Sequence, residues 1–274
     1  MAQDTGKFRT NTKDQFYTKS SVASACVSKI FELFPESTAY EWIEPSAGNG
    51  VFLNCLPAEI EKLGIDLQPN AAGIQKGNFL EWRPTTHKKR VIFGNPPFGK
   101  QSSLAKSFIK HASTYADIIA FILPRSFVKV SMSKAFPLEF HCRYSQELQK
   151  NAFEVNAVSY DVPCVFQIWE KQEENRVVAD PVKEVGFEYV KAGEAFHIAF
   201  KRVGGLAGQC LPQGGTYNPQ CFYFLKLQEK YIPHIQEIIE TVSAHVFPSN
   251  TVGPRSLSKS ETNEVLNLIL QGYP

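Results

Sequence analysis

The sequence predicts an α/β fold, a mostly parallel sheet flanked by helices, followed by a small C-terminal appendage. Between residues 20 and 171, short apolar runs alternate with helix-like stretches, as in sheets built from strand–helix crossover units. The 274 residues exceed the common domain size, and a composition of 43% hydrophobic and 20% charged residues supplies a core and excludes a disordered or collagen-like chain. After Lys171 the chain becomes charged and then rich in β-formers, which indicates a second, smaller region.

The elements of the core domain, residues 20–171, follow a polar and flexible arm at residues 1–19. Apolar residues on one helical face predict a helix from Ser20, which Ser20 or Ser21 can cap. Apolar runs predict strands at 39–43, 63–65, 91–93, 118–123 and 164–169, and helical character is found at 51–56, 68–73 and 102–115.

The C-terminal region, residues 172–274, is expected to be α+β. Ser258 and Glu261 match a capping box that opens a last helix, through Leu270. The other expected segments are a connector at 172–184, strands within 185–203 and 219–227, a glycine-rich loop at 204–215 and a helix over 231–242.

A glycine-containing loop with an acidic first residue follows the first predicted strand, with the sequence Glu44-Pro45-Ser46-Ala47-Gly48-Asn49-Gly50. Its glycines let the backbone approach a ligand at the carboxyl end of the strand, where open α/β sheets bind nucleosides. A phosphate-binding loop would carry a third glycine or a Gly-Lys-Ser/Thr ending, and Glu44 would repel phosphate. The loop therefore suits a ligand with an ammonium or sulfonium charge, although the glycine pair alone fits an ordinary strand-to-helix turn equally well.

Residues after the next two strands support a nucleoside site. Asp66 ends the second predicted strand, where a carboxylate can accept both hydroxyls of a ribose, and Leu67 adjoins it. Asn78 and Phe79 follow the third strand, which would lie between those at 63–65 and 91–93, and offer an amide for an adenine edge and a ring for its face. Together with the glycine loop, these positions predict a cofactor site.

A rigid polar turn, Asn95-Pro96-Pro97-Phe98, ends the fourth predicted strand. The prolines fix φ and remove two backbone donors, which leaves nearby carbonyls free to accept. The side-chain oxygen of Asn95 and the carbonyl of Pro96 can accept both hydrogens of an exocyclic amino group, while Phe98 offers a stacking face. Such acceptors would aim the amino lone pair at an electrophilic methyl group without a dedicated base. The alternative is a proline-stiffened turn with a core phenylalanine.

Taken in this order, the motifs resemble class I S-adenosylmethionine-dependent methyltransferases, and Asn95–Phe98 resembles their N6-adenine branch. Upstream, an aromatic-Thr pair, Tyr17-Thr18, resembles the family's N-terminal cofactor motif, which closes over the methionine part; its full sequence here is Asp14-Gln15-Phe16-Tyr17-Thr18-Lys19. With that element first, the order is similar to γ-type DNA adenine methyltransferases of restriction–modification systems and viruses. Downstream, Asp117–Phe127 resembles the rear of the target pocket.

This resemblance covers about residues 12–170 and implies a Rossmann-like fold, S-adenosylmethionine as cofactor and methylation of adenine N6 in DNA. Asn95–Phe98 would hold the target, and the cofactor residues would be Tyr17, Thr18, Glu44, Ser46, Gly48, Asn49, Gly50, Asp66, Leu67, Asn78, Phe79 and Asn95. The family usually has Asp where Asn78 stands, and a large target-recognition domain is absent, so a short recognition site or loose specificity is expected. The same turn occurs in RNA adenine and protein glutamine methyltransferases; RNA methylation and a catalytically silent nucleic-acid-binding subunit remain alternatives.

Charge distribution favours a nucleic-acid partner, although the formal net charge is only +2. Ten basic residues and one acid lie between Arg83 and Leu138, which predicts a positive surface that attracts phosphates, unless these are simply solvated basic loops. The candidate phosphate contacts are Lys100, Arg125 and Lys129. Gln101 or a C-terminal loop would fill the gap left by a flipped adenine. The loop at 204–215 with Tyr217 either contacts bases or is a surface connector.

Several classes of protein are disfavoured. No apolar run approaches a membrane span, and the N-terminus lacks the apolar block of a signal peptide, so an intracellular, soluble protein is expected. Six scattered cysteines and six histidines without ligand spacing suggest no metal site and no disulfide framework. Pro163-Cys164 lies too far along the chain for a cytosine C5 methyltransferase, and the sequence does not define an oligomeric state.

Overall fold

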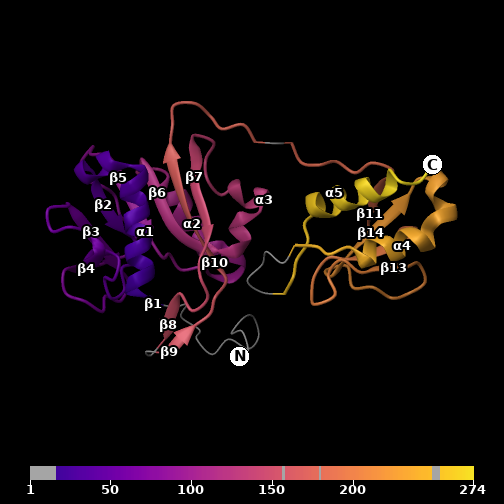
Figure 1. Cartoon of the computed structure of the whole chain (residues 1–274), viewed down its shortest axis with the longest axis horizontal. Coiled ribbons are helices and arrows are strands. Elements are labelled where there is room, and N and C mark those ends of the chain that lie inside the picture. The colour runs from indigo at the N-terminus through magenta and orange to yellow at the C-terminus, as the bar shows by residue number, and fades with distance from the viewer. Residues whose placement is uncertain (1–16, 156–157, 179, 249–253) are drawn as a thin grey trace. The chain divides into compact units, whose positions relative to one another are not determined.

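The computed structural model describes residues 17–155, 158–178, 180–248 and 254–274, and the chain divides into two compact units, Met1–Val177 and Val178–Pro274 (Figure 1). The polar arm predicted at 1–19, with Asp14 to Phe16 of the N-terminal motif, lies outside the described residues up to position 16. The first unit ends later than the predicted boundary at residue 171 because Arg176 donates hydrogen bonds to four backbone carbonyls of that unit, those of Ser133, Phe136, Pro137 and Phe140.

The first unit is built on a seven-stranded sheet with the order β4-β3-β2-β5-β6-β10-β7. The first five are parallel, and β10 is antiparallel to both its neighbours. Numbered along the chain, the order is 3-2-1-4-5-7-6, a doubly wound sheet with an antiparallel strand inserted near one edge. The strands are β2 (Glu41–Glu44), β3 (Lys62–Asp66), β4 (Ile74–Lys76), β5 (Arg90–Gly94), β6 (Ile118–Pro124), β7 (Phe140–Glu147) and β10 (Cys164–Lys171).

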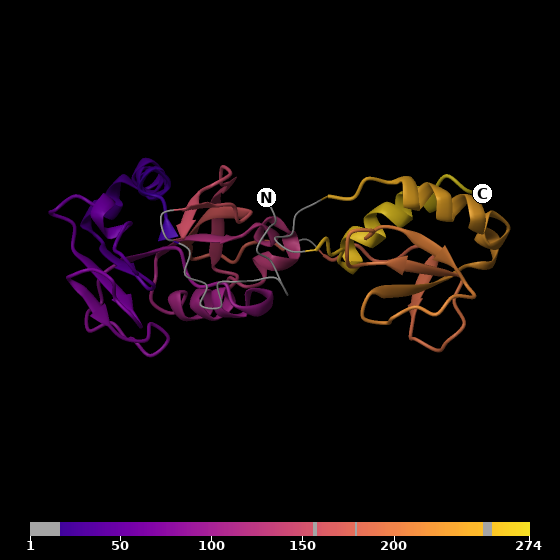
Figure 2. The same cartoon turned by 90° about the horizontal axis from the view of Figure 1, so that it is seen from below.

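The sheet is covered on both faces, which explains its near-continuous apolar strands (Figures 1 and 2). Successive strand residues point to opposite faces. Trp42 and Phe93 pack with α1 (Ser20–Leu33) on one face, while Ile43 and Ile92 pack with α2 (Ser103–Ala112) on the other. The shorter helices of this unit are η2 (Pro35–Ala39), η3 (Leu53–Cys55), η4 (Lys100–Ser102), η5 (Arg125–Val128) and α3 (Val130–Ser133).

The five predicted strands of the core domain are confirmed, with small shifts of their ends, but two predicted helices are wrong. Only the single turn η3 forms within 51–56, and 68–73 contains no helix. The second segment is held as a loop because the backbone N–H of Gln68 donates to Asp66 and that of Asn70 donates to the Gly48 carbonyl. Strand β7 was not predicted because it is a mostly exposed edge strand without an apolar run.

A small three-stranded sheet holds the first described residues. Strand β1 (Tyr17–Thr18) pairs antiparallel with β8 (Phe153–Val155), which pairs with β9 (Val158–Tyr160). The register places Tyr17 opposite Glu154 and Thr18 opposite Phe153. The Tyr17-Thr18 motif is therefore fixed by strand pairing.

The second unit is an antiparallel four-stranded sheet with two helices packed on it (Figure 2, orange to yellow). Its last helix begins with the predicted capping box, in which Ser258 Oγ accepts from the backbone of Glu261 and the Ser258 backbone donates to the Glu261 carboxylate. The elements are β11 (Phe187–Val190), β12 (Ile198–Lys201), β13 (Cys210–Pro212), β14 (Phe222–Leu227), η6 (Glu229–His234), α4 (Ile235–Ala244) and α5 (Lys259–Leu270).

Two expectations for this unit need correction. Strand β13 lies inside the stretch expected to be a glycine-rich loop, and pairing of Phe200 with Cys210 holds it in the sheet. The helix expected over 231–242 consists of η6 followed by α4, with Pro233 inside the first of these. Within the described part of the chain, no helix has the length and apolar character needed to cross a membrane.

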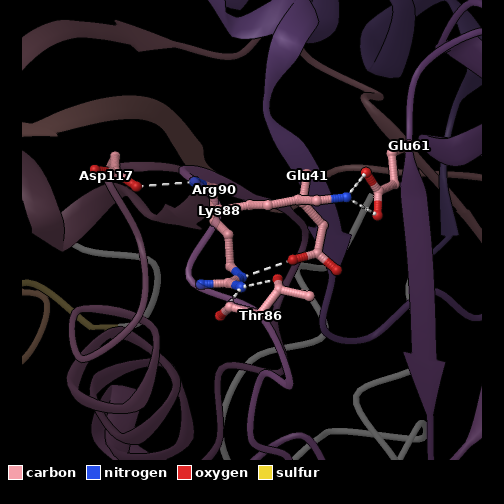
Figure 3. Close-up of polar contacts among 6 residues, drawn as sticks. All are labelled: Glu41, Glu61, Thr86, Lys88, Arg90 and Asp117. Carbon is pink, nitrogen blue, oxygen red and sulfur yellow. Dashed lines mark hydrogen bonds and ion pairs between the residues drawn. The ribbon is translucent and has the colours of Figure 1, made fainter.

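A polar cluster lies at the amino end of β5 (Figure 3). The guanidinium of Arg90, whose side chain is 5% exposed, donates to Glu41 at 2.7 Å and to the carbonyl and hydroxyl oxygens of Thr86 at 2.6 and 2.7 Å. The Arg90 backbone N–H donates to Asp117 at 2.8 Å. Beside this buried pair, Lys88 and Glu61 form an exposed ion pair at 2.6 Å.

These two ion pairs predict opposite mutational outcomes. Glu41→Ala leaves a buried guanidinium without its counter-charge and should lower the free energy of unfolding by about 3 kcal/mol. Glu61→Ala removes the partner of an exposed lysine and should cost about 0.5 kcal/mol or less. Urea unfolding of both variants measures the difference, and equal losses would contradict the assigned role of the Arg90 cluster.

Candidate active site

A cavity of about 600 Å³ lies where β2, β3 and β5 end. The strand order reverses between β2 and β5, and loops at such a reversal leave toward opposite faces of the sheet, which makes it the usual ligand site of open α/β sheets. The cavity is of the size that holds a small molecule or cofactor. The lining includes Tyr17, Thr18, Glu44, Ser46, Gly48, Asn49, Asp66, Leu67, Asn70, Asn78, Phe79, Asn95, Pro97, Leu104 and Phe108.

Glu44, the last residue of β2, brings a carboxyl group into this cavity. The residue is 2% exposed, and its Oε2 atom is buried with no hydrogen-bond partner among the described residues. Burial raises the pKa of this carboxyl well above its usual value, with a smaller contribution from Asp66, although a backbone hydrogen bond from Leu53 opposes the shift. A cationic group placed beside Oε2 would favour the ionised form of this carboxyl and provide a partner that the described residues do not.

Two glycines make room for the groups around Glu44. Gly94 has a φ of +122°, and a Cβ there would lie 3.1 Å from Cγ of Glu44. Gly48 has a φ of +52°, and a Cβ there would lie 3.2 Å from the ring of Tyr17. Both positions therefore require glycine for backbone conformation and for space. Gly50, with a φ of +74°, shapes the same loop without lining the cavity.

Tyr17 is held against the glycine loop by Asn70. The Asn70 side-chain amide donates to the Tyr17 hydroxyl at 2.5 Å, and its backbone N–H donates to the Gly48 carbonyl at 2.8 Å. Sequence reasoning missed Asn70 because it lies in a stretch that was expected to be helical. It also missed Gly94, although a glycine directly before the Asn95 turn was a readable signal.

The carboxylate of Asp66 is oriented by two backbone donors. Gly48 donates to Oδ2 at 2.8 Å and Gln68 donates to Oδ1 at 2.7 Å. Each oxygen retains acceptor capacity, so the pair of ribose hydroxyls expected here can still bind. Next to it, Leu67 lines the cavity with 64% of its surface exposed, which leaves an apolar side chain at the rim for a planar ring.

Asn78 and Phe79 also line the cavity; the adenine contact of Asn78 stays a prediction, whereas Phe79 is more buried than a stacking face requires. The Asn78 side chain accepts from the backbone of Leu80 at 3.1 Å and donates to Glu81 at 2.9 Å, so it shapes its own turn. Phe79 is only 2% exposed, and its ring packs against neighbouring aromatic rings, including that of Phe108. Phe79 therefore forms a wall of the cavity and not an open stacking face.

The Asn95–Phe98 turn presents alternate residues to the cavity. Asn95 and Pro97 line it, whereas Pro96 is buried and Phe98 packs against the core cluster that includes α1. Phe98 is half-buried, so its expected stacking role stays a prediction beside this packing. Asn95 is held at two points, because Ser46 Oγ donates to its carbonyl at 2.9 Å and its Nδ2 donates to Thr18 Oγ1 at 3.3 Å.

The residues directly after the Asn95–Phe98 turn have strained backbone conformations. Gly99 has a φ of +67°, and Gln101 and Ser102 have φ values of +54° and +60°. Residues other than glycine rarely adopt this left-handed region. Lys100 and Gln101 are exposed on the short helix η4. Strained residues of this kind cluster at functional sites.

The predicted positive surface is smaller than its sequence suggests. Arg125 forms a two-point ion pair with Glu147 at 2.8 and 2.9 Å, so its charge is neutralised within the protein. Arg90 pairs with Glu41 and Lys88 pairs with Glu61 at the amino ends of the strands, so neither contributes charge at the cavity. Lys100 is exposed and Lys129 half-buried at the start of α3. Across the described residues, no group of three or more His, Cys, Asp or Glu residues is arranged to hold a metal ion.

Comparisons with known proteins return methyltransferases among solved structures. No protein-family model matches the sequence, and the search of curated proteins gives no match. A type I restriction–modification methyltransferase subunit from Streptococcus thermophilus is 17% identical, with a TM-score of 0.48 over 98% of this chain and 61% of that one. A candidate RNA methyltransferase of Pyrococcus horikoshii is 14% identical, with a TM-score of 0.46 over 60% and 91% of the two chains.

A candidate class I S-adenosylmethionine-dependent methyltransferase of Listeria monocytogenes is 13% identical, with a TM-score of 0.44 over 64% of this chain and 66% of that one. The strand order of the first unit, with helices on both faces of its sheet, is that of a Rossmann-like fold.

The buried carboxyl of Glu44 predicts a pH dependence of stability. Between the ordinary pKa of 4.5 and its raised pKa, the folded protein holds a proton that the unfolded chain has lost, so stability falls as pH rises. Glu44→Gln should remove that fall, a difference approaching about 1.4 kcal/mol per pH unit. Unfolding measured from pH 4.5 upward tests this, with exposed Glu61→Gln as control; parallel curves for wild type and Glu44→Gln would refute it.

Proposed function

We propose that the protein transfers the methyl group of S-adenosylmethionine to N6 of adenine in DNA. The observation that carries the proposal is that the Glu44 loop, Asp66 and the Asn95 turn line one cavity at the reversal of strand order. A site for a cationic nucleoside, at Glu44 and Asp66, would thereby lie next to a site for an amino group, at Asn95.

The cofactor fits the donors that the cavity offers. The sulfonium or ammonium group would be the partner that the buried Oε2 atom of Glu44 lacks among the described residues. Asp66 would accept the ribose hydroxyls, and exposed Leu67 would contact the adenine ring. Gly48 lets the Tyr17 ring pack close to the glycine loop, and from that position Tyr17 would cover the methionine part. Bound there, S-adenosylmethionine supplies an electrophilic methyl carbon.

The Asn95 turn would hold the target amino group. The Asn95 side-chain oxygen and the carbonyl of Pro96 would form the acceptor pair for the two N6 hydrogens, and the bond from Ser46 to the carbonyl of Asn95 would hold the turn in place. These acceptors stabilise the positive charge that develops on N6 as the new N–C bond forms and the S–CH₃ bond breaks. The proton then leaves N6 to solvent, so no dedicated base is needed.

DNA is the proposed substrate because the order of the motifs resembles that of the γ-type DNA enzymes. A duplex adenine must leave the stack to reach the Asn95 turn. Exposed Lys100 and Gln101 follow the turn directly, where a phosphate contact and a gap-filling side chain would be needed. RNA adenine presents the same edge to Asn95, and an RNA pool is therefore included in the experiment.

Incubation with labelled S-adenosylmethionine and separate DNA, RNA and protein pools tests the function. Label is expected in N6-methyladenine of the DNA pool after nucleoside analysis. Asn95→Ala should lower transfer at least 100-fold, because the acceptor for N6 is lost, while cofactor affinity stays within a few-fold. Label confined to RNA or protein, or unchanged turnover in Asn95→Ala, would overturn the proposal.

The position of Asp66 predicts that its replacement weakens binding of the cofactor. Asp66→Ala removes the acceptor for the ribose hydroxyls and should weaken binding of S-adenosylmethionine about 10- to 100-fold by isothermal titration calorimetry. Glu61→Gln, an exposed carboxylate at the opposite edge of the sheet, should leave the affinity unchanged. An unaltered dissociation constant in Asp66→Ala would remove Asp66 from the site.

A further inference from the structure

We propose that Thr18 is a positioning residue that determines which way round the side-chain amide of Asn95 sits. The inference rests on the proposed function, because it concerns the same catalytic turn. Thr18 is 3% exposed, and its Oγ1 lies 3.3 Å from Nδ2 of Asn95, which donates to it. The two residues are 77 positions apart, so only the fold brings them together.

Orientation matters because an amide has different chemistry at its two ends. Its oxygen accepts hydrogen bonds and its nitrogen only donates. If the Asn95 amide were reversed, its NH₂ group would face the amino group of the target, and two donors would oppose each other. In the productive orientation Nδ2 points away from the target and needs an acceptor, which Thr18 Oγ1 provides.

Thr18 is well placed to act because its position is fixed. Its strand pairs with β8, and the next residue, Lys19, donates from its backbone to the carbonyl of Ala152 at 3.0 Å. Ser46 holds the main-chain carbonyl of Asn95, a contact that does not distinguish the two ends of the amide. Since Thr18 is buried, water cannot replace its hydroxyl readily, and a lost acceptor leaves a buried donor unsatisfied.

The same strand also touches the cofactor side of the site. Tyr17 contacts Asn70 and covers Gly48, while Thr18 contacts Asn95. These two adjacent residues therefore support different halves of the cavity. A change confined to the Thr18 hydroxyl should affect the amino-group half and leave the cofactor half intact.

A matched pair of variants tests the proposal. Thr18→Val keeps the shape of the side chain and removes Oγ1, whereas Thr18→Ser keeps the oxygen. Thr18→Val should lower kcat for DNA methylation about 10- to 100-fold with the dissociation constant for S-adenosylmethionine within twofold, and Thr18→Ser should retain kcat within threefold. A kcat of half the wild-type value or more in Thr18→Val, or equal losses in both variants, would overturn the positioning role.

A spectroscopic readout separates this proposal from the methyl transfer on which it rests. The side-chain NH₂ signals of Asn95, identified by their loss in Asn95→Asp, should shift in the ¹H–¹⁵N spectrum of Thr18→Val and stay near their wild-type positions in Thr18→Ser. If the wild-type protein methylates no DNA, the proposed function fails while these signals still report the contact. If the signals are the same in wild type and Thr18→Val, the positioning role fails even in an active methyltransferase.

Discussion

The parallel pairing of β2 with β5 is the constraint on which the site depends. The register places Ile43 opposite Ile92, so the two strands end side by side and deliver Glu44 and Asn95 to one edge of the sheet. Ser46 can then donate to Asn95 across a separation of 49 residues. Because the strand order reverses here, the loops diverge to opposite faces and leave a cavity that no side chain of the core fills.

The two edges of the sheet differ in how well their polar groups are satisfied. At the amino edge, the buried guanidinium of Arg90 has a counter-charge and two further acceptors. At the carboxyl edge, Glu44 Oε2 is buried without a partner among the described residues, and Gln101 and Ser102 hold strained backbone conformations. The unpaired polar atom and the strained backbone both lie at the edge where a ligand can bind and compensate their cost. Such locally unfavourable features are typical of functional sites.

Much of this arrangement was readable from the sequence because buried parallel strands are apolar runs and because turn motifs end them. The parts that were not readable depend on tertiary contacts. The stretch after Asp66 has the local pattern of a helix. It forms a loop because the Asp66 carboxylate and the Gly48 carbonyl accept hydrogen bonds from its backbone. Phe98 carries the signal of a stacking residue, and its packing against the core cluster could not be seen in the sequence. The charge of Arg125 could not be discounted before its pairing with Glu147 was known.

The second unit bears on how a target would be recognised. Tyr217, considered for base contacts, donates to the carbonyl of Pro212 at 2.7 Å and packs its ring on Phe222, so it belongs to the sheet of its own unit. These two contacts fix the orientation in which half-buried Tyr217 could meet a base. Beside the Asn95 turn, exposed Gln101 can donate and accept hydrogen bonds and is a second candidate for base contacts. Few base contacts support only a short recognition sequence, because each contact discriminates by a limited free energy.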